Sequence, residues 1–583
     1  MVNLVFQKAF LSFRKSGPRL YGFSSWAGFC LIVTLLLGFC LVRAVLATRE
    51  CLWPIGWDLL RDVSMGQVML DGRYPEDPIL LNETLWYNPL TGAILAFGHL
   101  ISGLSMPRVG VLIGPFLNLL APLGFTVAAA YFFGRAAALA GLCMVLFGRD
   151  PAVSIWVTFS YSPWVTASLY AAGLMLFLFF VYYNAFQRQS CPGYIAAGML
   201  LGVVFMAHTA PAIVAGGAML LHLVWEEGGS VWARLARRRN ACPPGRLEPI
   251  GTWRPVFLFS LLLLVAFLAS LPYTGSILWN YQFQVCNPAP SLFALDYVLL
   301  EQLPDRIGDA LNWPNGFALI GFLTVLCRRN RADRFVLCWT LTVSLLLIQH
   351  YLWQLLENHY GVRVPGLVPG HHGTIHMTAV RAVFFGAGIA FAGNFVARGI
   401  GRLCQVWGGS PSPRSFSALS KTAKTALACA AGVLLYLAHP LMTHPDFQRP
   451  DMNLYARYHQ RGIPIYEWIL EHTDPDAVFI CNDDEIAMTI VMPAARKLLF
   501  PPYIYSNPFV DPGPLSYHDR LLREAAKGDD AEVFCTERSK YSNVYMILRE
   551  EEFGASIAES APLFSEVFRT GGLVLLEARS CRE

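Results

Sequence analysis

Carboxylates gather directly behind the first strongly apolar segment of this chain. The stretch GWDLLRDVSMGQVMLDGRYPEDP (56–78) contains Asp58, Asp62, Asp71, Glu76 and Asp77. Asp58 and Asp62 are four residues apart, so they share one face if this stretch is helical. Like charges at that spacing repel unless a cation or a substrate lies between them. Such a carboxylate could act as a general base toward a hydroxyl group, and the alternative is a solvated helix at an interface.

A second group of candidate residues lies almost 300 residues later. The stretch NHYGVRVPGLVPGHHGTIHMTAVR (358–381) contains Arg363, His371, His372, His376 and Arg381. An arginine can bind a phosphate through two parallel hydrogen bonds. Arg381 begins an apolar segment, however, where an arginine also simply extends to the lipid headgroups. The His-His-x3-His spacing suits either a loop contact or a divalent metal ion, so the metal requirement stays unknown. We interpret His208, in AHTAP, as a residue at a helix break.

The composition decides where these residues must act. Of 583 residues, 55% are hydrophobic and only 14% are charged, whereas soluble domains have about 25% charged residues. Repeated apolar runs with few charges are typical of membrane-spanning helices. We predict a polytopic helical bundle of about 11–13 membrane helices, with spans at 26–47, 88–105, 109–133, 136–148, 151–162, 163–185, 193–208, 211–225, 255–272, 315–327, 335–356, 381–397 and 422–441.

Lysine and arginine predict how the bundle is oriented, because cytoplasmic loops carry an excess of them. Basic residues are frequent in the N-terminal tail and in the segments 226–254, 328–334 and 398–424, and they are sparse in 48–87, 273–314 and 357–380. We therefore expect a multi-pass membrane protein with a cytoplasmic N-terminus. The acidic loop 48–87 would then lie outside the cytoplasm, in the plasma membrane if the cell is bacterial or archaeal.

The last 142 residues differ in character from the rest. Helical and strand patterns alternate there, with YEWILEH, AVFIC, NVYMILRE and GGLVLLEA as examples, which predicts a small α/β unit. We expect two domains, a transmembrane domain at 1–441 and an extracytoplasmic α/β domain at 442–583. If that side is oxidising, the cysteines available for disulfides are Cys51, Cys286, Cys481, Cys535 and Cys581.

The order of these features carries a resemblance. One apolar helix is followed by a loop with WDLLRD, RYPEDP and YNPL, then by many spans, a His/Arg loop and an α/β tail. This arrangement resembles the GT-C superfamily of integral-membrane glycosyltransferases, which use polyprenyl-phosphate sugars. The sequence lacks the adjacent Asp-Asp or Asp-Glu pair that some branches carry at the end of the first helix.

The resemblance implies a reaction and roles for the candidate residues. Asp58 matches the catalytic base by position, with Asp62, Glu76 and Asp77 as second candidates. An acceptor hydroxyl would attack the sugar carbon in a single displacement with inversion, and the polyprenyl phosphate would leave toward Arg381, Arg363 and the three histidines. We expect Trp57, Tyr87 and Asn88 to contact the acceptor, which could be a glycan, a lipid or a protein. In the tail, NDDE (482–485), RK (496–497) and NPFVD (507–511) are polar candidates for holding it.

Two other classes of protein compete with a glycosyltransferase. A transporter or flippase usually buries ionisable residues within its spans, whereas the predicted spans contain no Asp or Glu. A structural or assembly factor would fit if the carboxylates proved dispensable. The partners expected for the enzyme are the lipid-linked donor, the acceptor and the bilayer, with no nucleic acid; a divalent metal ion is the one cofactor considered.

Overall fold

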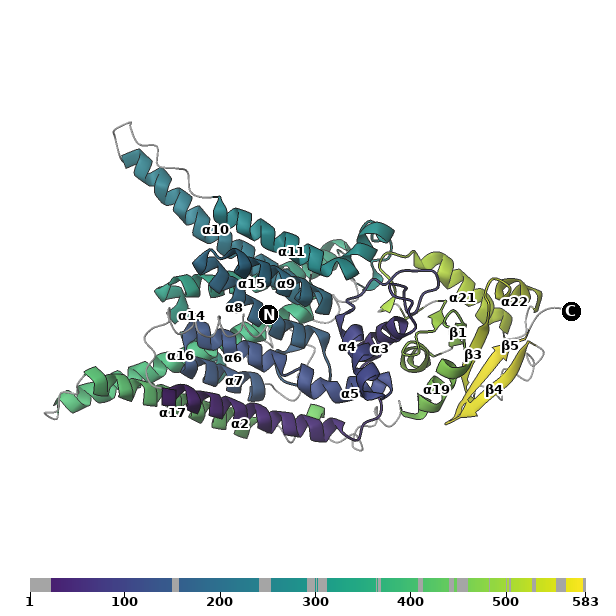
Figure 1. The fold of residues 1–583 in the computed structure, drawn as a ribbon, viewed down its shortest axis with the longest axis horizontal. Coiled ribbons are helices and arrows are strands. Elements are labelled where there is room, and N and C mark those ends of the chain that lie inside the picture. The colour runs from purple at the N-terminus through teal and green to yellow at the C-terminus, as the bar shows by residue number, and fades with distance from the viewer. Residues whose placement is uncertain are drawn as a thin grey trace.

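Long apolar helices form a bundle, and a mixed sheet lies at one end of it (Figure 1). The structure is a computed structural model. It describes residues 23–148, 157–240, 253–290, 299, 301, 312–362, 364, 368–406, 413–439, 445–447, 460–481, 483–499, 501–502, 505–526, 531–551 and 563–579. The helices before the tail are α2 (Phe23–Thr48), α3 (Trp57–Leu70), α4 (Leu90–Ser102), α5 (Met106–Leu117), α6 (Leu120–Phe133), α7 (Arg135–Phe147), α8 (Ala167–Arg188), α9 (Cys191–Ala207), α10 (Thr209–Asn240), α11 (Arg254–Ser276), α14 (Trp313–Arg328), α15 (Arg331–Tyr360), α16 (Gly370–Val406) and α17 (Pro413–Ala438).

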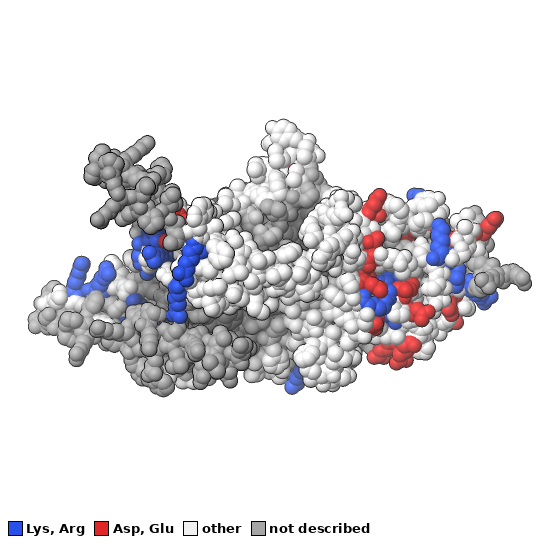
Figure 2. All heavy atoms as spheres, turned by 45° about the horizontal axis from the view of Figure 1, so that its top comes forward, with Lys and Arg blue, Asp and Glu red and all other residues white. Residues whose placement is uncertain are grey.

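Most of these helices are suited to a membrane. Among the described residues, eight helical segments are long and apolar enough to span one, with α5 and α6 counted together as Met106–Phe133, and three shorter apolar helices accompany them. On the face shown in Figure 2, charged side chains gather at the two ends of the molecule, and a broad band between them is almost free of charge. The predicted polytopic helical bundle is therefore confirmed, and the chain is a multi-pass integral membrane protein.

Several predicted span boundaries are wrong. The segment predicted as a span at 88–105 is α4, whose 13 residues are too few to cross a bilayer. The span predicted at 211–225 lies within the candidate span Thr209–Gly228, and the helix α10 that contains it runs on to Asn240. In the segment predicted as a span at 151–162, residues 157–162 form no α-helix, and 151–156 lie outside the described residues. There the Asn118 side chain donates to the Ser162 and Trp164 carbonyls at 2.9 and 2.6 Å, which satisfies carbonyls that a helix would otherwise use.

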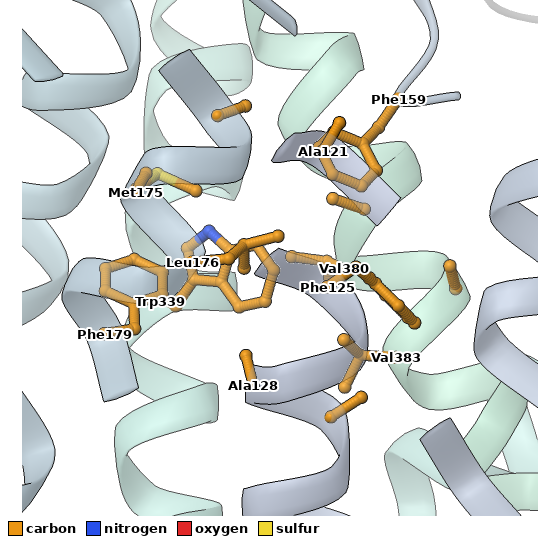
Figure 3. Packing of buried hydrophobic residues seen from close by; sticks show 14 of the residues in the cluster. Ala121, Phe125, Ala128, Phe159, Met175, Leu176, Phe179, Trp339, Val380 and Val383 are labelled. Atoms are coloured by element: carbon orange, nitrogen blue, oxygen red, sulfur yellow. The ribbon is translucent and has the colours of Figure 1, made fainter. Parts of the chain in front are cut away.

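Small residues let the helices of the bundle approach closely. A Cβ atom added to Gly124 of α6 would lie 2.2 Å from the Gly173 carbonyl oxygen of α8, so only glycine fits there. Aromatic rings fill the wider spaces nearby, as Figure 3 shows for Phe125, Phe179 and Trp339. Close backbone contact at small residues is how membrane helices associate, because lipid tails give no hydrophobic drive between them.

The tail folds as a five-stranded mixed sheet covered by helices. The strands are β1 (Val478–Cys481), β2 (Lys497–Leu498), β3 (Val544–Arg549), β4 (Phe564–Thr570) and β5 (Leu573–Ala578), in the order β2-β1-β3-β5-β4. β1 is parallel to β2 and β3, and β5 is antiparallel to β3 and β4. The accompanying helices are α19 (Ile463–His472), α20 (Asp484–Ile486), the π-helical turn η9 (Ala487–Val491), α21 (Pro512–Ala526) and α22 (Ala531–Arg538). The α/β character predicted for the tail is confirmed.

Alternating residues of the strands build two different cores. Val478 and Ile480 of β1 pack with Leu522 of α21 and Phe534 of α22 on one face of the sheet. Phe479 of β1 points the other way, as the two-residue period of a strand requires, into a cluster that also contains residues from the loop after α2: Trp53, Leu60 and Ile79. The acidic loop and the tail therefore share one hydrophobic core.

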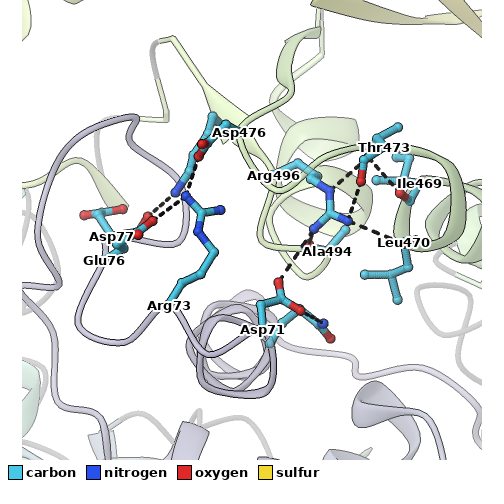
Figure 4. Close-up of polar contacts among 12 residues, drawn as sticks. Asp71, Arg73, Glu76, Asp77, Ile469, Leu470, Thr473, Asp476, Ala494 and Arg496 are labelled. Atoms are coloured by element: carbon cyan, nitrogen blue, oxygen red, sulfur yellow. Dashed lines mark hydrogen bonds and ion pairs between the residues drawn. The ribbon is translucent and has the colours of Figure 1, made fainter. Parts of the chain in front are cut away.

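Polar contacts hold the same two parts together, as Figure 4 shows. The buried Lys497 side chain of β2 donates from Nζ to the Asp77 backbone oxygen at 2.5 Å. Leu498 N donates to the Ile79 carbonyl oxygen at 2.8 Å. Arg73 forms ion pairs with Glu76 and with Asp476 of the tail. These contacts dock the loop against the edge of the sheet.

Among the described residues, fewer of the candidate cysteines are disulfide-bonded than the sequence allowed. Cys51, Cys286 and Cys481, which the sequence made available for disulfides, are not disulfide-bonded. Cys535 of α22 is disulfide-bonded, and Cys581 lies outside the described residues. Cys481 is buried in the cluster shared by the loop and the tail, and Cys51 is buried against Val111 of α5; in both places the cysteine acts as a small apolar residue.

Candidate active site

Three ionisable side chains lie on the first two turns of α3. Arg61 donates from Nη1 to Asp58 Oδ1 at 3.1 Å and from Nη2 to Asp62 Oδ1 at 3.3 Å. The guanidinium therefore lies between the two carboxylates and removes the repulsion that their i, i+4 spacing would cause. Their exposure differs greatly, since the side chain of Asp62 is 3% exposed and that of Asp58 is 43% exposed. Asp58 is thus the carboxylate of this group that faces solvent.

Two tyrosines enclose the Arg61 guanidinium. Its central carbon lies 3.5 Å from the centroid of the Tyr87 ring and 5.5 Å from that of the Tyr505 ring, which is cation–π geometry. Tyr505, from the tail, also donates its hydroxyl to Asp58 Oδ1 at 3.2 Å. Asp58 Oδ1 accepts two hydrogen bonds, whereas Asp58 Oδ2 makes none to the described part of the chain. One oxygen is held in place and the other is available.

Burial changes how these groups titrate. Burial raises the pKa of Asp62 to about 7, although the neighbouring Arg61 charge opposes the increase. Burial disfavours the charged form of Arg61, but the two tyrosines and the two carboxylates around it outweigh that effect and hold its pKa above the ordinary value. Asp62 consequently changes charge near neutral pH while Arg61 stays cationic.

Four histidines continue the site from α3 into the bundle. His208 interrupts the helical run between α9 and α10 with an extended backbone (φ −165°, ψ 134°), and Pro211 follows in the first turn of α10. The His208 ring lies 6.4 Å from that of Tyr87 and 4.5 Å from that of His372, and the His372 ring lies 4.1 Å from that of His371 (ring centroids). A continuous row of rings therefore connects Arg61 to the start of α16.

The histidines are also close to the charges of α3. His371 is close enough to Asp58, and His208 to Arg61, for electrostatic interaction. His376, one turn further along α16, is 1% exposed. The buried Nδ1 atoms of His372 and His376 have no hydrogen-bond partner within the described residues, and an unpaired buried polar atom of this kind is costly. These atoms could bind a ligand.

Asn88 stabilises the break at His208 between α9 and α10. Its side-chain amide donates to the Phe205 carbonyl oxygen at 2.6 Å and to Thr209 Oγ1 at 3.1 Å. It thereby satisfies a carbonyl that the break frees at the end of α9. Because Asn88 follows Tyr87 directly, this contact also places the Tyr87 ring beside Arg61.

Not every predicted site residue reaches this cluster. Asp77 is buried in the loop–tail interface, where its Oδ1 accepts from the Ile79 and Leu80 backbone N–H groups at 2.8 and 2.9 Å. Glu76 pairs with Arg73 in the same interface. Arg381 lies about 14 Å along the axis of α16 from His372, at 1.5 Å per residue, and donates weakly to the Gly148 carbonyl oxygen at 3.5 Å. Arg363 lies outside the described residues.

The structure gives no support for a metal held by the protein. In the described part of the chain, no three His, Cys, Asp or Glu side chains are placed to coordinate one ion. His371, His372 and His376 lie on one helix with two of their rings packed against each other, and Arg61 occupies the space between the carboxylates. These donors do not fit a metal site, and we derive no step through a metal.

Sequence reasoning missed three members of the cluster. Arg61 follows Asp58 by three residues, a spacing that favours an ion pair on a helix. The sequence did not show, however, that its guanidinium lies between the two carboxylates. The His208 break was recognised, but the sequence did not show that it faces Tyr87 and His372. Tyr505 has no signal of its own, because only the docking of the tail brings it to Asp58.

The fold was compared with known proteins. No family model and no curated protein matches the chain. Among solved structures, ArnT from Cupriavidus metallidurans matches it with 14% identity. The structure bound to undecaprenyl phosphate has a TM-score of 0.50 and covers 96% of this chain and 99% of that one. The apo structure has a TM-score of 0.51, with 94% and 98% covered.

A second, weaker likeness is to the Archaeoglobus fulgidus oligosaccharyltransferase tethered with an acceptor peptide. It has 12% identity, a TM-score of 0.47, and coverage of 96% of this chain and 74% of that one. At such low identity, a likeness over the whole length shows the fold and not the activity. The match to ArnT over nearly the whole of both chains shows that this chain has the same fold as ArnT.

Proposed function

We propose that this protein transfers a sugar from a polyprenyl-phosphate donor to an acceptor hydroxyl, with Asp58 as the general base. The observation that carries the proposal is the meeting of two distant segments. Asp58 presents an available oxygen beside Arg61, and the ring row of His208, His372 and His371 starts at the same place. A base and a group of phosphate-binding donors in one place are what such a transfer needs.

The step follows from these positions. Asp58 Oδ2 accepts the proton of the acceptor hydroxyl as its oxygen attacks the anomeric carbon. The bond from that carbon to the phosphate oxygen breaks, and its electron pair leaves with the polyprenyl phosphate. A single displacement of this kind inverts the configuration at the anomeric carbon. The negative charge that develops on the phosphate is stabilised by hydrogen-bond donors already in place.

Arg61 and the histidines are the donors proposed for the phosphate. Arg61 is cationic at every relevant pH, and a neutral imidazole can donate one hydrogen bond through a ring N–H. The unpartnered Nδ1 atoms of His372 and His376 suit a ligand that brings acceptor oxygens. ArnT, which shares the fold, was crystallised bound to undecaprenyl phosphate, which supports a lipid phosphate as the ligand.

The other predicted site residues have supporting roles in this proposal. Trp57, 41% exposed at the start of α3, is the aromatic side chain best placed to contact an acceptor. The Tyr87 ring is covered by Arg61 and the Asn88 amide is bonded to the α9–α10 break, so they position the site. Arg381 could meet the donor only if the lipid-phosphate extended along α16.

We further propose the orientation and the domain division expected from the sequence. The acidic loop and the tail (442–583) would face away from the cytoplasm, and the bundle (1–441) would hold the lipid. The concentration of Lys and Arg at the end of the molecule opposite the tail in Figure 2 supports this orientation. Labelling of single introduced cysteines from either side of sealed vesicles would test it.

The test of the function is sugar transfer by purified protein in a bilayer. Wild-type protein, Asp58→Asn and Asp71→Asn would be given synthetic polyprenyl-phosphate sugars, and release of polyprenyl phosphate would be measured. Asp71 is the matched control, because it caps the same helix but faces Arg496 of the tail at 3.9 Å. We expect about a 10³-fold loss in Asp58→Asn, as for other lost catalytic bases, and near-normal activity in the control.

Two results would refute the proposal. Full activity in Asp58→Asn would remove Asp58 from the role of base. Movement of lipid-linked sugar across the bilayer without release of polyprenyl phosphate would identify a flippase instead.

A further inference from the structure

A cavity lies in the tail, apart from the Asp58 cluster. Its volume is about 460 Å³, within the range of about 300–1,000 Å³ that is usual for small-molecule sites. It is formed by residues that follow β1, by the end of β3, and by the turn between β4 and β5, which includes Gly571 and Gly572. Nothing in the proposed transfer step uses it.

The cavity lies where the sheet topology favours ligand binding. β1 and β3 are parallel neighbours. The chain leaving the carboxyl end of β1 turns through α20 and η9 to β2, on one side, whereas the chain leaving β3 continues to β4 and β5, on the other side. Connections that diverge in this way leave a crevice outside the carboxyl ends of the two strands. Glu485 after β1 and Arg549 at the end of β3 line this cavity.

The lining combines an apolar floor with a rim of charges of both signs. Ile486 and Ile490 are buried beneath the cavity. Around the mouth lie Arg461, Glu485, Arg549, Glu550 and Glu551. Arg549 is paired with Asp483 and lies 3.7 Å from Glu485, so its charge is largely balanced. A strongly anionic ligand would meet three carboxylates here and is disfavoured.

The turn between β4 and β5 keeps one side of the cavity open. Gly571 and Gly572 have φ angles of +59° and +81°, a conformation that other residues rarely adopt. A Cβ atom on Gly572 would meet no atom within 4 Å. The glycines therefore border the mouth with backbone alone, and they leave room for a ring-shaped ligand.

We propose that this cavity binds an uncharged, hydroxylated saccharide unit of the acceptor, an inference that rests on the proposed function. A pyranose ring has a face of C–H groups, which suits the isoleucine floor, and an edge of hydroxyl groups. Those hydroxyls can donate to carboxylates and accept from guanidinium groups. The acceptor is accordingly a glycan or a molecule that carries one.

Buried residues connect the floor of the cavity to α3, the helix that carries Asp58. η9 forms part of its floor and also packs against α3. Leu60, two residues after Asp58, lies in the same buried cluster as Ile486 and Ile490. A saccharide in the cavity would therefore hold the acceptor next to the helix that carries the base.

The test is saccharide binding by the full-length protein. Saturation-transfer NMR in a sugar-free detergent would use the methyl glycosides of glucose, mannose, galactose and N-acetylglucosamine as probes. Glu550→Gln would be compared with Glu566→Gln, because both carboxylates pair with Arg569, at 2.8 and 2.6 Å, but only Glu550 lines the cavity. Circular dichroism would establish that both variants fold.

We expect at least one methyl glycoside to bind, with affinity about tenfold weaker in Glu550→Gln, as for a lost hydrogen bond to a charged group, and unchanged in Glu566→Gln. Absence of binding to the wild type, or equal weakening in both variants, would overturn the proposal. Binding would also be measured in Asp58→Asn. Lost transfer with intact binding there agrees with both proposals, whereas intact transfer with intact binding refutes only the role of Asp58.

Discussion

Replacing Asp62 with asparagine is expected to change how the stability of the protein depends on pH. In the folded protein, burial raises the pKa of this carboxyl from 3.8 to about 7. The folded state thus binds more protons than the unfolded state between these two values. The stability that this proton contributes is fully present below pH 3.8 and is lost as the pH rises through 7.

The size of the effect follows from the difference between the two pKa values. The difference is about 3, and each pKa unit corresponds to about 1.36 kcal/mol. Ionised Asp62 therefore costs about 4 kcal/mol of folding free energy above pH 8 relative to the protonated form at pH 4. Asparagine has no proton to lose, so Asp62→Asn removes this dependence while keeping the shape of the side chain. The exposed fraction of 3% leaves little solvent screening.

The assay is thermal unfolding in detergent at intervals from pH 4 to pH 8.5. Groups distant from Asp62 titrate equally in both proteins, so the difference between wild type and Asp62→Asn reports on Asp62 and its immediate neighbours. That difference should shift in favour of the variant by several degrees between pH 4 and pH 8. The control is Asp71→Asn, which removes a carboxylate from the C-terminal end of the same helix and leaves Asp62 in place. A wild-type curve parallel to that of Asp62→Asn would show that Asp62 is ionised throughout and would refute the reasoning.

Three further substitutions test the contacts around the site. Arg61→Lys keeps the charge but loses the two-carboxylate geometry and the stacking on Tyr87; sugar transfer should fall about 10–100-fold in kcat, and an unchanged kcat would contradict the role of Arg61. Tyr505→Phe removes the hydroxyl that donates to Asp58 and should cost about three- to tenfold in kcat/KM; an unchanged kcat/KM would argue against this contact. Lys497→Met removes the donor to the Asp77 carbonyl oxygen and should lower the unfolding free energy by about 1–3 kcal/mol. Lys540, an exposed lysine that pairs with Glu537, provides the control for that measurement, because Lys540→Met should lower the unfolding free energy by less than about 1 kcal/mol.

The acidic stretch illustrates how far sequence reasoning reaches. Its five carboxylates look alike in sequence, and the order of candidates placed Asp58 first only by its position after the first apolar segment. In the structure they divide into two groups. Asp58 and Asp62 lie around Arg61, whereas Asp71, Glu76 and Asp77 face the tail (Figure 4). The division arises because α3 turns the first group toward the bundle, and the chain after Leu70 runs along the edge of the sheet.

Errors in the predicted spans have a similar origin. Apolar composition predicted spans at 88–105 and 151–162, but it did not determine whether a helix of sufficient length forms in either segment. α4 is short and packs against α3 and α5. Residues 158–166 form no helix, and Asn118 donates to two of their carbonyls, those of Ser162 and Trp164.

The sequence by itself determined the class of the molecule, because composition and the length of apolar runs respond directly to the bilayer. It also determined the α/β character of the tail, since strand and helix periods are local. Only the tertiary structure decided which groups meet. His208, His372 and Tyr505 come from three separate segments, and their contacts depend on helix packing and on the docking of the tail. Such contacts join residues hundreds of positions apart, and no local pattern encodes them.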